Sequence, residues 1–148
     1  NDKEEIEKYS LEKNDVLFNR TNSPELVGKS AIYRGERPAI FAGYLIRVNR
    51  KKDLLNGDYL NYYLNLSSTR MYGSSVMISS VNQANINGTK LKEYSIPLPS
   101  KDKQLLLVKK LDKFKSQTQS LESNYQQELD ALDELKKSIL EKAFNGEL

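Results

Sequence analysis

The feature that most constrains this chain is a long stretch near its C-terminus, residues 100–144, that contains neither Gly nor Pro. When this stretch is written in heptads from Gln104, large apolar or aromatic residues occupy eight of the twelve a and d positions: Leu107, Leu111, Phe114, Leu121, Tyr125, Leu132, Leu135 and Ile139. The pattern predicts one helix, capped by Ser100 and ended by Asn145-Gly146. At about 1.5 Å per residue such a helix spans roughly 60 Å, which is more than so small a domain can cover. We therefore expect a coiled coil; the alternative, a single amphipathic helix on a globular core, suits shorter stripes.

The charges along this stretch predict how the paired helices run. Residues 101–115 carry six Lys and two Asp, whereas residues 116–148 carry three Lys and seven acidic residues. An antiparallel pair places each positive end beside the negative end of its partner, whereas a parallel pair places like charges together. We therefore expect an antiparallel coiled coil, formed with an equivalent helix or with a second copy of this one.

The residues before the helix have the mixed pattern of an α+β domain. One or two helical turns are expected within residues 1–14, and short strands at 15–18 and 31–34. In residues 42–49, Ala42, Tyr44, Ile46 and Val48 alternate with Gly43, Leu45, Arg47 and Asn49, a period of two that is typical of a half-buried strand.

Further along, Asp58 is the expected N-cap of a helix that continues to about residue 70 and is stopped by Gly73. Its apolar stripe of tyrosines and leucines is assigned to the core. Residues 74–88 are rich in Ser, Asn and Gly and indicate an irregular segment. Residues 94–99 cannot be helical, because each of their two prolines disfavours the helical conformation in the preceding residue.

The composition argues against an enzyme and for recognition of an anion. The chain has no His and no Cys, so the commonest general base and the commonest zinc ligands are missing. All six Arg lie between Arg20 and Arg70, in a region (residues 16–92) with eleven basic and four acidic residues. Guanidinium suits phosphate or guanine, although a basic region can also serve solubility alone. No apolar run is long enough to cross a bilayer and no leader sequence is evident, so a cytoplasmic protein is expected.

Three motifs occur in the order known from one family. The run DVLFNRTNSPELVGK at residues 15–29 resembles the strand and loop of target-recognition domains in type I restriction-modification specificity subunits. DYLNYYL at residues 58–64 looks like the helix that follows there. NQANIN at 82–87, then LKEYSIPLP at 91–99, is similar to the family's Gln-containing loop and its exit into the dimerisation helix.

The resemblance implies a non-catalytic DNA-recognition subunit. Residues 1–98 would be a partial target-recognition domain with a twisted β-sheet and short helices, N-terminally truncated relative to the family, and residues 99–148 a long coiled-coil dimerisation helix. Its partners would be double-stranded DNA, methyltransferase subunits and a motor-nuclease subunit. No cofactor is expected in this chain, since S-adenosylmethionine, ATP and Mg would bind the partner subunits. Two loops would read one half of a bipartite site in the major groove through Arg20, Thr21, Asn22, Lys29, Asn82, Gln83 and Asn85.

Alternatives remain open for each of these assignments. The polar residues of both loops also suit ordinary turns without a ligand. Other basic residues could touch phosphates but are assigned to solvated surface: Arg34, Arg37, Arg47, Arg50, Lys51 and Lys52. The whole chain could be a coiled-coil interaction module without specific DNA binding, and a small nuclease is a further, weaker alternative. The salt dependence of DNA binding separates a DNA-recognition subunit from an interaction module. Affinity that depends on phosphate contacts falls steeply as the salt concentration rises, whereas an interaction module should show no such DNA binding.

Leu121 tests the predicted seam. Leu121→Asp places a charge at a d position, where it would be desolvated between helices, and should convert a dimer into monomers in sedimentation. A variant that sediments like the wild type would contradict the heptad assignment.

Overall fold

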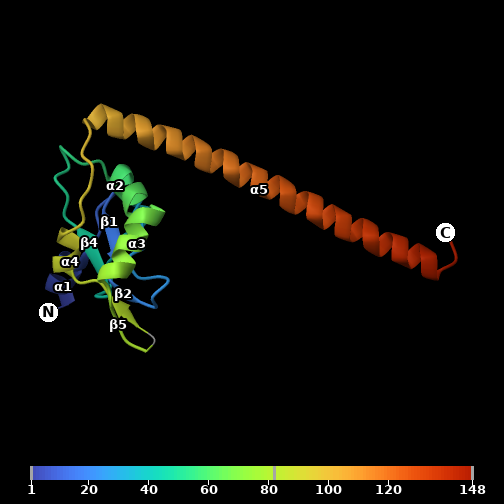
Figure 1. Cartoon of the computed structure of the whole chain (residues 1–148), viewed down its shortest axis with the longest axis horizontal. Helices are drawn as coiled ribbons and strands as arrows, with labels where there is room; N and C mark the ends of the chain where they lie inside the picture. Colours follow the sequence, from blue (N-terminus) through green and yellow to red (C-terminus); the bar gives the residue numbers. More distant parts are fainter. Residues whose placement is uncertain (1, 82, 148) are drawn as a thin grey trace. The chain divides into compact units, whose positions relative to one another are not determined.

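The computed structural model describes residues 2–81 and 83–147 and forms two compact units, Asn1–Val108 and Lys109–Leu148. The first unit contains all strands, four short helices and roughly the first two turns of a long helix, and the second contains the rest of that helix (Figure 1). The α+β class with a long terminal helix is therefore confirmed. No helix of the described residues is long and apolar enough to cross a membrane.

The first sheet is built around one buried strand. Strand β1 (Val16–Asn19) lies between β3 (Ser30–Ile32) and β4 (Leu45–Val48), antiparallel to both. The side chains of Val16 and Phe18 are fully buried, as the alternation of a strand requires when one face meets the core. The three strands predicted at 15–18, 31–34 and 42–49 are confirmed. The first is shifted by one residue, and the other two are shorter than predicted.

The predicted helix from Asp58 to residue 70 is two helices, α2 (Gly57–Leu64) and α3 (Ser67–Val76). The cap of α2 is Asn56, whose side-chain oxygen accepts from the backbone N–H of Tyr59, so the assignment to Asp58 is wrong. The break has an identifiable cause in Asn65. Its side-chain amide donates to the backbone oxygen of Ser30 at 2.9 Å and accepts from the Ser30 N–H at 3.1 Å. The same amide also donates to the Asn61 backbone oxygen at 2.9 Å, which is the acceptor of the helical Asn65 N–H, and this local bond competes with continuation of the helix.

Gly73 does not stop a helix either, because α3 passes through it to Val76. It is buried, and a Cβ at this position would lie 2.7 Å from the hydroxyl of Tyr94. Close packing therefore favours glycine at this position, because any side chain would displace the hydroxyl of Tyr94, which lies against α3.

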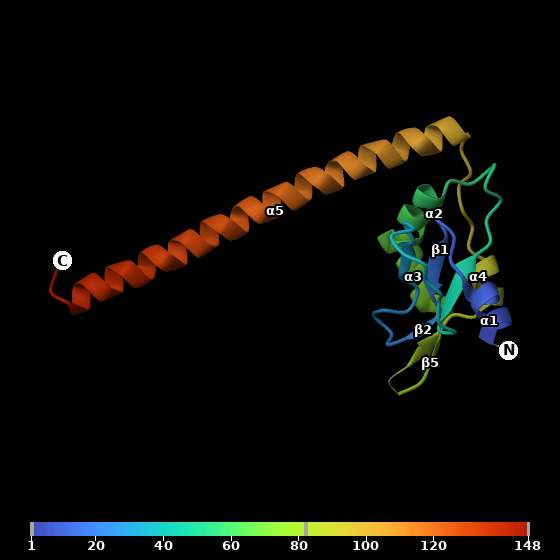
Figure 2. The same ribbon diagram turned by 180° about the vertical axis from the view of Figure 1, so that it is seen from behind.

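The segment predicted to be irregular contains a second sheet. Strands β5 (Ile78–Ser79) and β6 (Ala84–Asn85) pair with each other, and β6 also pairs with β2 (Thr21–Asn22), in the order β2-β6-β5. The hairpin and the start of the long helix lie at opposite ends of the first unit (Figures 1 and 2). Two further short helices complete the unit: α1 (Asp2–Tyr9) and α4 (Gly88–Lys92).

One core joins both sheets and α2. It is formed by seven buried residues: Val16, Phe18, Val27, Leu60, Leu64, Ala84 and Ile86. Tyr94 packs against this cluster, with its ring 6.0 Å from that of Phe18 in an edge-to-face arrangement. The core therefore ties the hairpin to the first sheet, although the two are far apart in the sequence.

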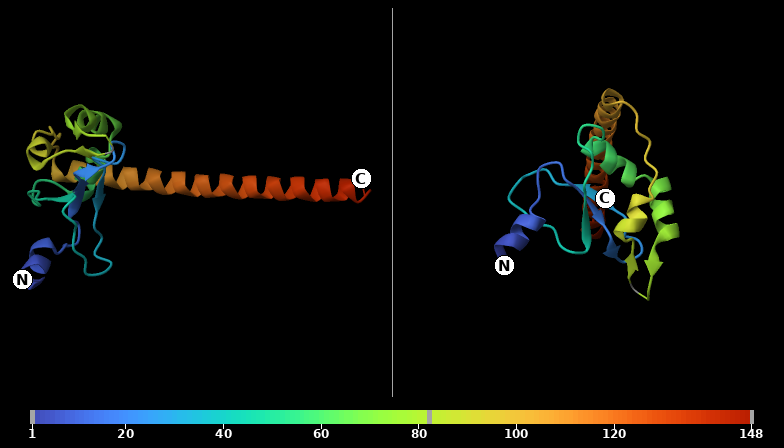
Figure 3. Two further views of the ribbon diagram at one scale, coloured as in Figure 1. Left: turned by 90° about the horizontal axis from the view of Figure 1, so that it is seen from below. Right: turned by 90° about the vertical axis from the view of Figure 1, so that its left-hand side faces the viewer.

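Residues 94–100 are not helical, as predicted for residues 94–99, and lead into α5 (Lys101–Phe144), one continuous helix (Figure 3). The predicted end is also confirmed. Gly146 has a φ of 70°, its N–H donates to the Ala143 oxygen, and the N–H of Glu147 donates to the Lys142 oxygen. This is the bond pattern of a glycine-terminated helix.

The capping assignment can be tested by comparing two neighbouring residues. Asn56→Ala removes the cap of α2 and should lower the free energy of unfolding by about 1 kcal/mol in urea titrations followed by circular dichroism. Asp58→Ala removes one member of a surface ion pair with Arg34 (2.5 Å) and should cost about 0.5 kcal/mol. A larger loss from the Asp58 variant would contradict the cap.

Candidate nucleic-acid interface

Arg20 stands where the two sheets meet. It lies between β1 and β2, and its backbone N–H donates to the oxygen of Tyr44 at 3.0 Å. Its backbone oxygen accepts from the N–H of Ile86 at 2.8 Å. These two bonds connect the first sheet to the hairpin, and they fix the start of the first predicted loop.

Pairing of β2 with β6 brings the two predicted loops together. Thr21 lies opposite Asn85, and the Asn85 amide donates to the Thr21 hydroxyl oxygen at 2.6 Å. An open depression of about 470 Å³ lies on this part of the surface. It is lined by Thr21, Asn22, Ser23, Tyr44 and Gln83. Three of the predicted DNA-reading residues, Thr21, Asn22 and Gln83, therefore line one depression, although they come from segments about sixty positions apart, and Asn85 bonds Thr21 beside it.

One predicted residue, Lys29, does not belong to this cluster. Lys29 does not line the depression; it follows the loop, and its backbone oxygen accepts from the Asn19 N–H at 2.9 Å. Asn82 lies outside the described residues.

The side chain of Arg20 carries an unusual feature. Its Nε is buried, and within the described part of the chain it has no hydrogen-bond partner. The Oδ1 atom of the adjacent Asn19 is in the same condition.

Tyr44 is a member of the site that the sequence analysis missed. The alternating pattern placed it in a strand beside Ile46, but β4 begins only at Leu45. The Leu45 N–H closes a turn onto the Ala42 oxygen, and the Tyr44 side chain is 57% exposed. The sequence did contain a signal for a turn, because the preceding residue is Gly43 and glycine is typical of turns. An exposed aromatic ring beside amides suits contact with bases.

Arg70, on α3, is a second residue that was missed. Its guanidinium donates to the backbone oxygen of Val27 at 2.5 Å and to that of Glu25 at 2.8 Å. The loop turns at Gly28, whose φ is 82° and whose N–H donates to the Asn19 oxygen at 2.7 Å. The planar guanidinium group of Arg70 thus fixes two backbone carbonyl groups of the first loop.

Glu25 is also held within this loop. The hydroxyl of Ser23 donates to its carboxylate at 2.7 Å, and this bond is the main reason why the pKa of Glu25 is lowered.

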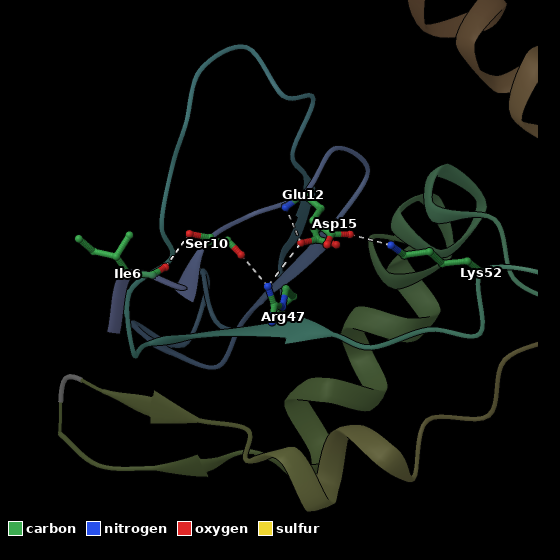
Figure 4. Close-up of polar contacts among 6 residues, drawn as sticks. All are labelled: Ile6, Ser10, Glu12, Asp15, Arg47 and Lys52. Carbon is green, nitrogen blue, oxygen red and sulfur yellow. Dashed lines mark hydrogen bonds and ion pairs between the residues drawn. The ribbon is translucent and has the colours of Figure 1, made fainter. Parts of the chain in front are cut away.

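Two basic residues assigned to solvated surface, Arg47 and the exposed Lys52, have partners in the fold. Arg47 donates to the backbone oxygen of Ser10 at 2.6 Å and lies 3.8 Å from the carboxylate of Asp15 (Figure 4). Lys52 forms an ion pair with Glu12 at 2.9 Å, and the hydrogen bond and charge of Lys52 lower the pKa of that carboxyl. These contacts join the N-terminal segment to β4 and the residues after it.

On α5, all eight predicted seam residues are exposed in the single chain, with exposed fractions from 39% at Leu111 to 63% at Phe114. The remaining first a position, Gln104, behaves differently, because it is fully buried within the first unit. The apolar stripe is therefore uncovered from Leu107 onward, and its burial by a second helix remains a prediction.

The depression offers amides, hydroxyls and an aromatic ring. Among the described residues no group of three or more His, Cys, Asp or Glu is placed to hold a metal ion. The arrangement can donate and accept hydrogen bonds in several directions at once, which suits recognition of a polar surface such as the edges of bases.

Comparison with known proteins identifies the family. Residues 1–131 match the model of the type I restriction modification DNA specificity domain. The chain is 33% identical over 144 residues to the "Putative type I restriction enzyme MjaX specificity subunit" of Methanocaldococcus jannaschii, covering 95% of this chain and 32% of that protein. It is 31% identical to the type I restriction enzyme StySPI specificity subunit of Salmonella potsdam (99% and 32%) and 27% identical to the EcoKI specificity subunit of Escherichia coli K12 (97% and 32%).

The chain thus spans about a third of the length of these relatives. The match nevertheless runs through the strands, the hairpin and most of α5. The chain belongs to the family of type I restriction-modification DNA specificity domains.

Proposed function

We propose that this chain reads one half of a bipartite DNA sequence for a type I restriction-modification complex. The observation that carries the proposal is the pairing of β2 with β6, which gathers Thr21, Asn22 and Gln83 around one open depression beside Tyr44. Asn and Gln side chains can bond adenine in bidentate fashion, and Arg20 can reach guanine or a phosphate. The excess of basic residues between 16 and 92 favours an anionic partner.

The rest of the complex follows from this role. The chain acts without catalytic residues of its own, and the methyltransferase and motor-nuclease subunits carry S-adenosylmethionine, ATP and Mg. The exposed stripe of α5 pairs with an antiparallel helix that belongs to a second recognition domain. That domain, in another copy or in another part of a longer chain, reads the other half of the site. The names of the relatives, all specificity subunits, support this assignment.

A coiled-coil interaction module without specific DNA binding is the second candidate function. The exposed stripe of α5 favours it as much as it favours the first. The polar depression does not, because a domain that only ends a coiled coil gains nothing from amides gathered at one surface. Sequence discrimination on DNA therefore decides between the two.

Arg20 and Gln83 should contribute to discrimination more than to general affinity. Changing either to Ala should cost about 1–3 kcal/mol on the cognate duplex and much less on random DNA, in fluorescence anisotropy titrations at fixed salt. Arg37→Ala, an exposed basic residue outside the depression, is the matched control and should affect both duplexes equally and weakly. Equal losses of affinity on both duplexes would show that Arg20 and Gln83 contact the DNA backbone and do not read base edges.

Arg70 should act on the shape of the first loop rather than through its charge. Arg70→Lys keeps the positive charge but cannot span the two carbonyl oxygens, so amide hydrogen exchange at Leu26 and Val27 should accelerate. Affinity for the cognate duplex should fall about tenfold, as for loss of one base contact, while affinity for random DNA stays near the wild-type value. If the Lys variant kept wild-type exchange and specificity, the loop would not depend on the guanidinium group.

A further inference from the structure

Gln104 is the most completely bonded side chain of α5. It is 0% exposed, although its place in the first heptad would put it in the seam. Its Nε2 donates to the backbone oxygens of Leu54 at 2.9 Å and Pro99 at 2.8 Å. Its Oε1 accepts from the backbone N–H of Asn56 at 2.8 Å. Both donors and the acceptor of the amide are thus used on the recognition domain and on the segment that leads into the helix.

These bonds attach the first turn of α5 to the start of α2. The partner of Gln104, Asn56, is itself the cap of α2. Lys101 adds a hydrogen bond to the backbone oxygen of Lys52. Val108, one turn after Gln104, is also buried within the first unit, with an exposed fraction of 9%. The attachment therefore covers the first two turns of the helix.

The extended segment between the domain and α5 is also held to α2. The hydroxyl of Tyr59 donates to the Pro97 oxygen at 2.9 Å, and that of Tyr63 donates to the Ser95 oxygen at 2.7 Å. A free linker of Pro and Ser would have its carbonyls in water. Here, bonds from two successive turns of one helix hold it along its length.

We propose that Gln104 is a positioning residue: with Tyr59 and Tyr63 it makes the connection between recognition domain and coiled coil rigid, and thereby sets how strictly the protein measures the distance between two half-sites. This inference rests on the proposed function. One extra base pair shifts a half-site by about 3.4 Å and rotates it by about 35°. A rigid connection cannot follow that change, whereas a loose one can.

The rigidity can be measured without DNA. The chain has no Cys, so Cys introduced at the exposed Thr89 and Lys113 give two unique spin-label sites, in labelled protein diluted with unlabelled protein. Gln104→Met keeps the length of the side chain but removes all three bonds, and it should broaden the distance distribution at least twofold. The matched control is Gln126→Met, because Gln126 is exposed on the same helix and bonds only Asp130 among the contacts described; it should leave the width unchanged.

Function is then tested on the full-length protein. Duplexes carry the cognate site, the same site with its spacer lengthened or shortened by one base pair, or one half-site alone. Gln104→Met should reduce discrimination between spacers by about tenfold, the scale of one mismatched pair, with half-site affinity within about twofold of the wild type. Tyr59→Phe, which removes a single hydroxyl and keeps the ring, should give the same change to a smaller degree.

Three results would overturn the inference. They are an unchanged distance distribution in Gln104→Met, unchanged spacer discrimination, and a parallel loss of half-site affinity, which would make Gln104 an ordinary stabilising residue. Failure of the proposed function is distinguishable, because the wild-type protein itself would then bind no duplex specifically, while the spin-label measurement would still report on the connection.

Discussion

The recognition surface depends on the backbone of Arg20, through which two small sheets are connected. Strands β2, β5 and β6 have two residues each, and a ribbon of that size is not stable alone in water. It is stable here because Arg20 bonds Tyr44 on one side and Ile86 on the other, while Ala84 and Ile86 enter the core of the first sheet. The polar side chains of the depression therefore hold their places only while the whole unit is folded.

Features set by local repetition could be predicted from the sequence. The long helix and its glycine end are of this kind, since heptad spacing and Asn145-Gly146 are local signals. The strand around Val16 is another, because its alternation matches its burial. Features that depend on distant partners could not be predicted. Asn65, where the predicted helix is divided, bonds Ser30, 35 residues away in the sequence, and the hairpin strands are too short to have a period.

The candidate site shows the same division. The sequence identified both loops through Arg20 and Gln83, because turn residues with amide and guanidinium groups are visible locally. It missed Tyr44, because the alternating pattern begins before β4 does and so placed Tyr44 in the strand. It also missed Arg70, whose role depends on carbonyl groups more than 40 residues away in the sequence. Net charge was also an incomplete guide, since Arg47 and Arg70 donate to backbone oxygens of the fold itself.

The β5–β6 hairpin has a consequence for how such a protein can change during evolution. Ile78, Ser79, Val81 and Gln83 are exposed, and the fold holds the hairpin mainly through its backbone pairing and the buried Ala84. Substitutions at the exposed positions alter the chemistry that the surface presents and cost little stability. The exposed face of the hairpin can therefore change by single mutations in a lineage while the unit stays folded.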